Sequence, residues 1–172
     1  MKYSNIKLND IANGTGIRVS LFVSGCTHHC IGCFNKETWS FNYGTEFTVD
    51  TEDFIISELS KDWVSGLSIL GGEPFEPVNQ KGLLPFIRKV RHIFPDKSIW
   101  CYTGYLFDVD LVEGGSVFCE VTNELLSCYD VIVDGPFVID LKDITLKFKG
   151  SSNQRVIDVA LSRSSNRIIE KI

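Results

Sequence analysis

Three cysteines, Cys26, Cys30 and Cys33, lie in one short stretch with the spacing C-x3-C-x2-C. A cubane [4Fe–4S] cluster has four irons, and each iron normally takes one cysteine thiolate. A loop that supplies only three thiolates leaves one iron open, and an open iron can bind a substrate. The spacing therefore predicts a cluster that takes part in chemistry rather than one that only stores an electron.

A structural zinc site is the main alternative for this loop, with His28 or His29 as a fourth ligand. Zinc sites usually combine two separated pairs of ligands, and no second cysteine pair follows this loop. Burial of the three thiols as plain core residues is a third interpretation. The residues of this loop favour an iron–sulfur cluster and leave a zinc site as the open alternative. The other cysteines stand alone among apolar residues and are expected in the core, namely Cys101, Cys119 and Cys128.

The composition is that of a globular domain, with 172 residues of which 44% are hydrophobic. No apolar run reaches the roughly 18–20 residues that a membrane span needs, and the first residues lack the apolar stretch of a signal peptide. We therefore expect a cytoplasmic protein without a membrane partner, in a compartment where thiols stay reduced. The net charge of −5 argues against direct nucleic-acid binding.

The charge is distributed unevenly along the chain. Residues 142–172 contain seven Lys or Arg and three Asp or Glu, a local charge of +4, so the remainder carries −9. A solvated basic tail is the simpler interpretation. The alternative is that the segment from about residue 142 faces an acidic partner, with Lys147, Lys149 and Arg155 as docking cations.

Four short apolar runs, partly β-branched, predict β-strands. Strand and helix alternate along the chain, which predicts a mostly parallel sheet covered by helices in a single α/β domain. Because only four strands are clear, we expect an open, incomplete α/β barrel. The predicted strands are 17–23, 66–70, 98–102 and 131–133.

Three helical segments are expected between these strands. The first begins at an N-cap formed by Asp50 or Thr51 and runs to Leu59. The second covers 82–94, with Pro85 in its first turn because proline suits only that part of a helix. The third extends from about 116 to 128. Beyond Gly135 the pattern weakens, and strand, loop and tail all remain open.

An unusual loop follows each predicted strand. The cysteine loop follows the first, and the others begin with Gly71-Gly72-Glu73-Pro74, Thr103-Gly104-Tyr105 and Asp134-Gly135. In parallel α/β folds, active sites form at the carboxyl ends of the strands. Adjacent glycines also let the backbone approach a ligand closely. We therefore expect these loops to form one site.

The cysteine loop resembles the signature of radical S-adenosylmethionine enzymes. Several further segments are similar to the anaerobic ribonucleotide reductase activating proteins, and the resemblance runs from about residue 5 to 157. Thr15, Phe34 and Pro136 depart from the pattern of that family. The segments that carry the resemblance are 13–16 (NGTG), 21–26 (LFVSGC), 32–39 (GCFNKETW), 70–74 (LGGEP), 100–105 (WCYTGY), 133–135 (VDG) and 150–155 (GSSNQR).

The resemblance implies one radical-SAM domain over residues 1–172, with the cluster loop at 24–40. It implies that three cysteines, Cys26, Cys30 and Cys33, hold one [4Fe–4S] cluster and that the fourth iron binds S-adenosylmethionine. No catalytic residue beyond the cluster and cofactor is expected. The residues expected to contact the cofactor are Gly32, Cys33, Phe34, Gly71, Gly72, Glu73 and Thr103.

The resemblance also implies a reaction and its partners. An external one-electron donor, such as a reduced flavodoxin, reduces the cluster, and S-adenosylmethionine is cleaved to methionine and a 5′-deoxyadenosyl radical. That radical removes a hydrogen from a glycine on the large subunit of an anaerobic ribonucleotide reductase. The alternatives are an activator of another glycyl-radical enzyme such as pyruvate formate-lyase, a radical enzyme acting on a small molecule, and a zinc-stapled interaction module.

Overall fold

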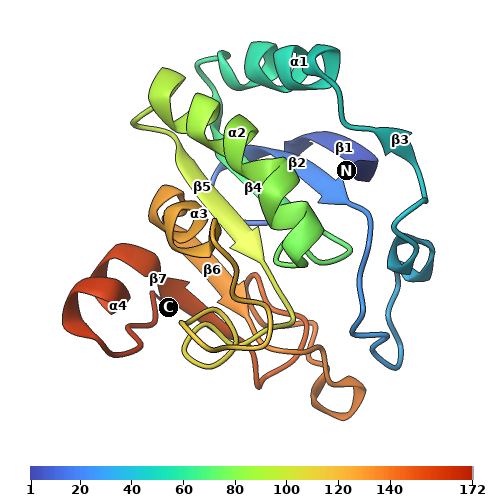
Figure 1. The fold of residues 1–172 in the computed structure, drawn as a ribbon, viewed down its shortest axis with the longest axis vertical. Coiled ribbons are helices and arrows are strands. Elements are labelled where there is room, and N and C mark those ends of the chain that lie inside the picture. Colours follow the sequence, from blue (N-terminus) through green and yellow to red (C-terminus); the bar gives the residue numbers. More distant parts are fainter. Residues whose placement is uncertain (172) are drawn as a thin grey trace.

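Four parallel strands form the centre of the sheet in the computed structural model, which describes residues 1–171 (Figure 1). They are β2 (Ile17–Val23), β4 (Val64–Gly71), β5 (Ser98–Tyr102) and β6 (Val131–Asp134). Each contains one of the runs predicted as strands, and neighbouring strands pair in parallel. The predicted mixed α/β domain with a largely parallel sheet is therefore confirmed.

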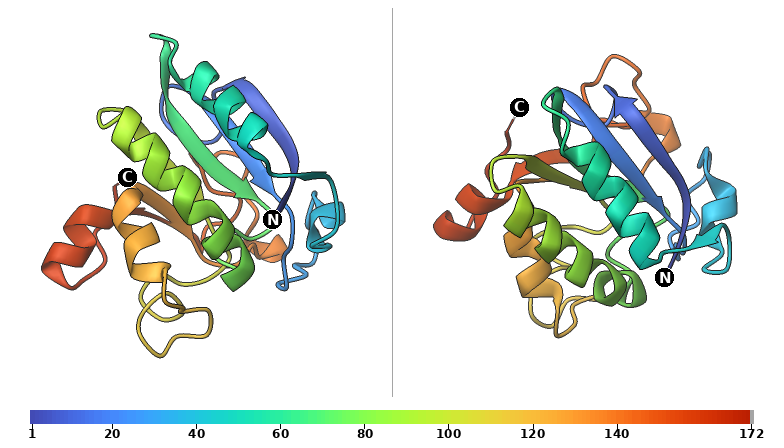
Figure 2. Two further views of the ribbon diagram at one scale, coloured as in Figure 1. Left: turned by 45° about the horizontal axis from the view of Figure 1, so that its top comes forward. Right: turned by 90° about the horizontal axis from the view of Figure 1, so that it is seen from above.

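Antiparallel strands extend this parallel centre at both sides. β1 (Lys2–Asp10) pairs with β2, β3 (Thr45–Glu46) pairs with β1, and β7 (Arg155–Asp158) pairs with β6. The strand order is β3-β1-β2-β4-β5-β6-β7. Because the two edge strands, β3 and β7, do not pair with each other, the sheet stays open, in keeping with an incomplete barrel (Figure 2).

The three predicted helices lie along one face of the sheet (Figure 2). They are α1 (Val49–Leu59), α2 (Pro77–Ile93) and α3 (Thr122–Cys128). A fourth, α4 (Val159–Ser165), follows β7, so the segment left open by the sequence contains both a strand and a helix. Two 3-10 turns, η1 (Lys36–Trp39) and η2 (Ile139–Leu141), belong to the loops at the carboxyl edge.

The helix starts differ from the predicted ones. α1 is capped by Thr48, whose side chain accepts a hydrogen bond from the Thr51 N–H, so Asp50 and Thr51 lie inside its first turn. α2 begins at Pro77, because a proline at the first helical position already has the required φ. Pro85 therefore lies inside the helix and not in its first turn. The predicted start of α3 at 116 was also too early, since 116–121 form a loop.

The main core lies between the helices and the sheet, and alternate residues of β2 face it. Val19 and Leu21 point into it, together with buried residues of β4, β5 and α2. Cys101 and Cys128 are buried as predicted, whereas Cys119 is only partly buried beside Gln80. Within residues 1–171, no helix is both long enough and apolar enough to cross a membrane.

A buried polar network occupies the other face of β2. Ser20 donates to Asp10 Oδ2 at 2.7 Å, and Asn13 Nδ2 donates to the same oxygen at 2.5 Å. The Arg18 Nε donates to Ser68 Oγ at 2.6 Å. Burial of these groups is tolerated because they hydrogen-bond one another. The network fixes the turn after β1, which brings Asn13 to the carboxyl-edge cavity described below.

Candidate functional site

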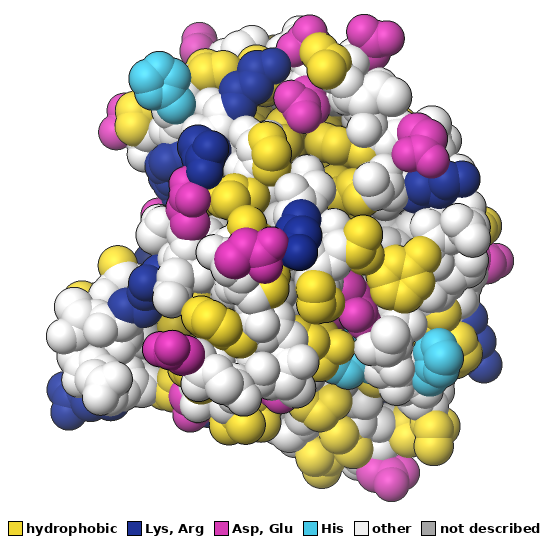
Figure 3. All heavy atoms as spheres, viewed as in Figure 1, with side chains coloured by type: hydrophobic (Ala, Val, Ile, Leu, Met, Phe, Trp, Pro, Cys, Tyr) yellow, Lys and Arg dark blue, Asp and Glu magenta, His cyan; other side chains and the backbone are white. Residues whose placement is uncertain are grey.

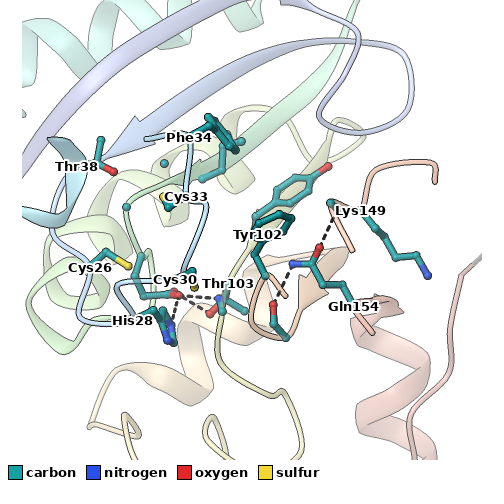
Figure 4. Close-up of a pocket in the computed structure, with 18 of the residues that line it drawn as sticks. Cys26, His28, Cys30, Cys33, Phe34, Thr38, Tyr102, Thr103, Lys149 and Gln154 are labelled. Carbon is teal, nitrogen blue, oxygen red and sulfur yellow. Dashed lines mark hydrogen bonds and ion pairs between the residues drawn. The ribbon is translucent and has the colours of Figure 1, made fainter. Parts of the chain in front are cut away.

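The loops that follow β2, β4, β5 and β6 enclose a cavity of about 400 Å³ (Figure 4). This volume lies within the range of small-molecule sites, roughly 300–1,000 Å³. The predicted convergence of these four loops is therefore observed. The predicted site residues that line the cavity are Cys26, Cys30, Cys33, Phe34, Gly71, Gly72, Glu73 and Thr103.

Gly32 is the one predicted site residue that does not line the cavity. Its φ of +79° favours glycine, and a Cβ at this position would lie 2.9 Å from Ile139 Cδ1. Gly32 therefore joins the cysteine loop to the segment around η2. At the cavity mouth, the Phe34 ring is 93% exposed, so a bound molecule could cover it.

The three cysteines of the loop are free thiols around one part of the cavity (Figure 4). Cys26 is buried, and Cys30 and Cys33 are partly buried. Among residues 1–171, no three His, Cys, Asp or Glu side chains converge closely enough to hold a single metal ion.

The protonation of the thiols follows from their burial. Burial raises the pKa of Cys26 to about 12, with neighbouring acidic charges adding to the effect, and burial also raises the pKa of Cys30. Metal centres bind the thiolate form, so a metal centre bound by this loop would displace protons from its thiols. The Asn35 N–H lies 3.4 Å from Cys33 Sγ, and hydrogen bonds to sulfur of this kind adjust cluster potentials.

Adjacent glycines fit the end of β4 against the cysteine loop. Gly71 has a φ of +111°, and the Gly72 N–H donates to the Val23 carbonyl at 2.7 Å. A Cβ at Gly72 would lie 2.6 Å from the Gly25 carbonyl oxygen, closer than any side chain tolerates. The two loops touch through their backbones, which leaves the main chain of Gly71 and Gly72 exposed to the cavity.

The carboxylate of Glu73 is held entirely by protein groups and is 1% exposed. Oε1 accepts hydrogen bonds from the Phe75 N–H at 2.8 Å and the Thr103 hydroxyl at 2.7 Å. Oε2 accepts from the Gly104 N–H at 2.8 Å and from His28 Nε2 at 2.9 Å. Burial alone would lower the pKa of His28, but the hydrogen bond to Glu73 and the negative charges of Glu73, Glu76 and Asp110 together outweigh burial and raise the pKa. Both oxygens are thus occupied by the fold.

The opposite wall comes from the segment that the sequence left undecided. Gln154 Nε2 donates to the Gly135 carbonyl at 2.9 Å, and its Oε1 accepts from the Gly150 N–H at 2.8 Å (Figure 4). These bonds hold the loop after β6 against the loop before β7, so that Phe148 and Lys149 line the cavity. In the sequence, this wall was indicated by the loop at Asp134-Gly135 and by the family resemblance of 150–155.

The chain is similar to known proteins over most of its length. Residues 12–157 match the family model described as a 4Fe-4S single cluster domain. The chain is 42% identical over 158 residues to the anaerobic ribonucleoside-triphosphate reductase-activating protein of Escherichia coli (strain K12), covering 91% of this chain and 97% of that protein. The proteins of the same name from Haemophilus influenzae and Enterobacteria phage T4 are each 39% identical over 156 residues, covering 96% and 93% of their lengths.

Proposed function

Because the chain belongs to the family of anaerobic ribonucleoside-triphosphate reductase-activating proteins, we propose that it generates a glycyl radical on an anaerobic ribonucleotide reductase. In this proposal one [4Fe–4S] cluster is held by Cys26, Cys30 and Cys33, and S-adenosylmethionine binds beside it. The observation that carries the proposal is that these three thiols line one cavity together with the Gly71-Gly72 backbone. The relatives named above favour this reductase over pyruvate formate-lyase as the partner.

When bound and reduced, the cluster and S-adenosylmethionine supply a carbon-centred radical that removes a hydrogen from glycine. The chain's own residues bind and orient these groups. The exposed backbone of Gly71 and Gly72 offers polar groups to the methionine part of the cofactor, and Phe34 offers an aromatic face to the adenosyl part. Glu73 and Thr103 act by fixing the loops around the cavity, because their hydrogen bonds are made to each other and to the protein.

Exposed apolar side chains of the cysteine loop and of the segment around η2 are suited to contact a segment of the reductase. Ile31 and Ile144 are 80% and 90% exposed, and Ile139 and Leu141 of η2 are also exposed. Figure 3 shows hydrophobic side chains at the lower end of the molecule. An apolar surface beside the cavity that a partner covers would help to exclude water from a reactive radical.

The basic segment from about residue 142 is proposed to border this contact. Lys142 and Lys147 are exposed and lie in the loop that carries η2 toward the cavity wall. Arg155 is engaged in internal ion pairs with Asp134 and Asp108, which argues against a docking role for it. We also propose that the protein works in the cytoplasm and takes its electron from an external donor such as a reduced flavodoxin.

The proposal is tested by anaerobic reconstitution with iron and sulfide, reduction in the presence of S-adenosylmethionine, and assay of 5′-deoxyadenosine. The expected result is one cluster per chain and reductant-dependent 5′-deoxyadenosine. Both should be lost in Cys26→Ala, Cys30→Ala and Cys33→Ala and retained in Cys119→Ala, a thiol outside the cavity. A colourless protein that binds stoichiometric zinc and forms no cluster would contradict the proposal.

A further inference from the structure

We infer that His28 is a positioning residue: through Glu73 it locks the cysteine loop to the ends of β4 and β5 and thereby sets the properties of the cluster. The inference rests on the proposed function, since it concerns the cluster proposed for this loop. It assigns a role to the spacer between Cys26 and Cys30, whose residues bind no metal in that proposal.

The spacer residues face different surroundings. The Thr27 N–H and hydroxyl both donate to Glu76 Oε1, at 2.8 and 2.6 Å, and His28 Nε2 donates to Glu73 Oε2 at 2.9 Å. His29 is exposed and only stacks on Trp39. Two consecutive spacer residues are thus anchored to two buried carboxylates of the segment between β4 and α2, while the third points outward.

Glu73 connects His28 with the loop after β5. The same carboxylate accepts the Thr103 hydroxyl and the Gly104 N–H, so one buried group holds three of the loops around the cavity (Figure 4). The His28 ring also stacks on Tyr105, with 4.2 Å between ring centroids. Loss of the His28 bond would free the cysteine loop on one side and leave the Glu73 carboxylate with one donor fewer.

Gly104 provides an independent way to disturb the same contact. A Cβ on Gly104 would lie 2.6 Å from His28 Nε2 and 2.7 Å from Cδ2. Its backbone is not in the left-handed region, so an alanine there is opposed mainly by the His28 ring. Because that ring ends a rotatable side chain, Gly104→Ala should displace His28 from Glu73 without changing either residue.

The charge of Glu73 makes the inference measurable. A buried anion beside the cluster opposes the addition of an electron, and hydrogen bonds to that anion weaken its effect. Removing the His28 donor should therefore make the midpoint potential of the cluster more negative. Removing the anion in Glu73→Gln should make the midpoint potential more positive. A purely structural role would not produce shifts of opposite sign.

The test uses the full chain, reconstituted anaerobically, with iron and sulfide content, midpoint potential, and electron paramagnetic resonance spectra with and without S-adenosylmethionine. His28→Phe keeps the ring but removes the donor, and His28→Gln restores a donor. His29→Asn is the matched control, since asparagine tolerates the left-handed backbone found there, with φ at +49°.

The expected result is a more negative potential and an about tenfold lower rate of S-adenosylmethionine cleavage in His28→Phe and Gly104→Ala, in the range seen for outer-shell changes. In His28→Gln the potential and the cleavage rate should recover toward the wild-type values, and in His29→Asn both should equal the wild-type values. Cluster-loaded His28→Phe and Gly104→Ala with wild-type potential and spectra would overturn the inference. If His28→Phe takes up no cluster, equal potentials in Gly104→Ala and wild type would overturn it. Failure of the wild-type protein to form a cluster would instead refute the proposed function.

Discussion

The guanidinium of Arg155 forms two hydrogen bonds with the buried carboxylate of Asp134, from Nε to Oδ1 at 2.9 Å and from a terminal nitrogen to Oδ2 at 2.5 Å. Asp108 accepts a third bond at 2.8 Å. Asp134 ends β6 and Arg155 begins β7, so the pair ties the antiparallel edge strand to the parallel centre. The hydrogen bonds that Arg155 donates to Asp134 outweigh partial burial and raise the pKa of Arg155.

Arg155→Ala should lower the free energy of unfolding by about 3 kcal/mol, because it leaves a buried carboxylate without its partner. Urea denaturation followed by circular dichroism measures this change. Asp108→Asn is the control: Asp108 is half exposed, and loss of its contact should cost less than about 1 kcal/mol. Equal, small effects of the two substitutions would contradict the structural role of Asp134 and Arg155.

Charge reversal at Lys142 and Lys147 should weaken activation of the reductase while leaving the fold intact. Both side chains are exposed, so each substitution should change the stability by less than about 0.5 kcal/mol. The measurement is glycyl radical yield at several reductase concentrations, compared with 5′-deoxyadenosine formation without the reductase. Unchanged activation at limiting reductase would show that this segment does not face the partner.

Gly72→Ala should abolish cluster retention, because its Cβ would meet the Gly25 carbonyl oxygen at 2.6 Å and the Thr38 carbonyl oxygen at 3.0 Å. Both contacts are with backbone, so the cysteine loop itself must move. Iron and sulfide content after anaerobic gel filtration measures the effect. Gly114→Asn is the control, since no atom lies within 4 Å of a Cβ there and asparagine tolerates its φ of +85°. Full cluster content in Gly72→Ala would refute this prediction.

Asp10 should stabilise the protein at neutral pH and lose that effect in acid. Burial opposes its ionisation, but hydrogen bonds from Ser20, the Ala12 N–H, Asn13 and Lys7 outweigh burial and lower the pKa to about 2 from 3.8. Because the folded pKa is below the ordinary one, the contribution is complete above pH 3.8 and disappears as the pH falls through about 2.

Asp10→Asn should therefore cost about 1–3 kcal/mol at neutral pH, where it replaces an acceptor shared by several donors. The difference from wild type should narrow as the pH falls toward 2. Thermal unfolding of both proteins across this pH range measures the difference in stability. The comparison removes the contributions of the other carboxylates, because both proteins contain them. A difference that is independent of pH would show that the charge of Asp10 contributes nothing.

The sequence alone predicted the parts of the fold that have a strong local pattern. β2, β4, β5 and β6 are largely buried, apolar and partly β-branched, and all four were found. β1 was missed because its sequence, KYSNIKLND, is largely polar, and it takes its strand form from pairing with β2 and β3. The start of α2 was missed because the helix begins at Pro77, where the sequence has no repeat of apolar residues at helical spacing.

The site shows the same division between local and long-range information. The spacing of the cysteines and the Gly71-Gly72 pair are local, and both sets of residues lie at the cavity as expected. The contact of His28 with Glu73 joins residues 45 positions apart, and that of Gln154 with Gly135 joins residues 19 apart. No local pattern specifies such contacts, so the roles of His28 and Gln154 became visible only in the folded chain.

The most direct test of the account is the electron paramagnetic resonance spectrum of an anaerobic ribonucleotide reductase after incubation with this protein, S-adenosylmethionine and a reductant. The account predicts a glycyl radical signal that requires all three additions and is absent with Cys26→Ala, Cys30→Ala or Cys33→Ala. A wild-type protein that holds its cluster and cleaves S-adenosylmethionine, yet leaves the cognate reductase without a radical, would contradict it.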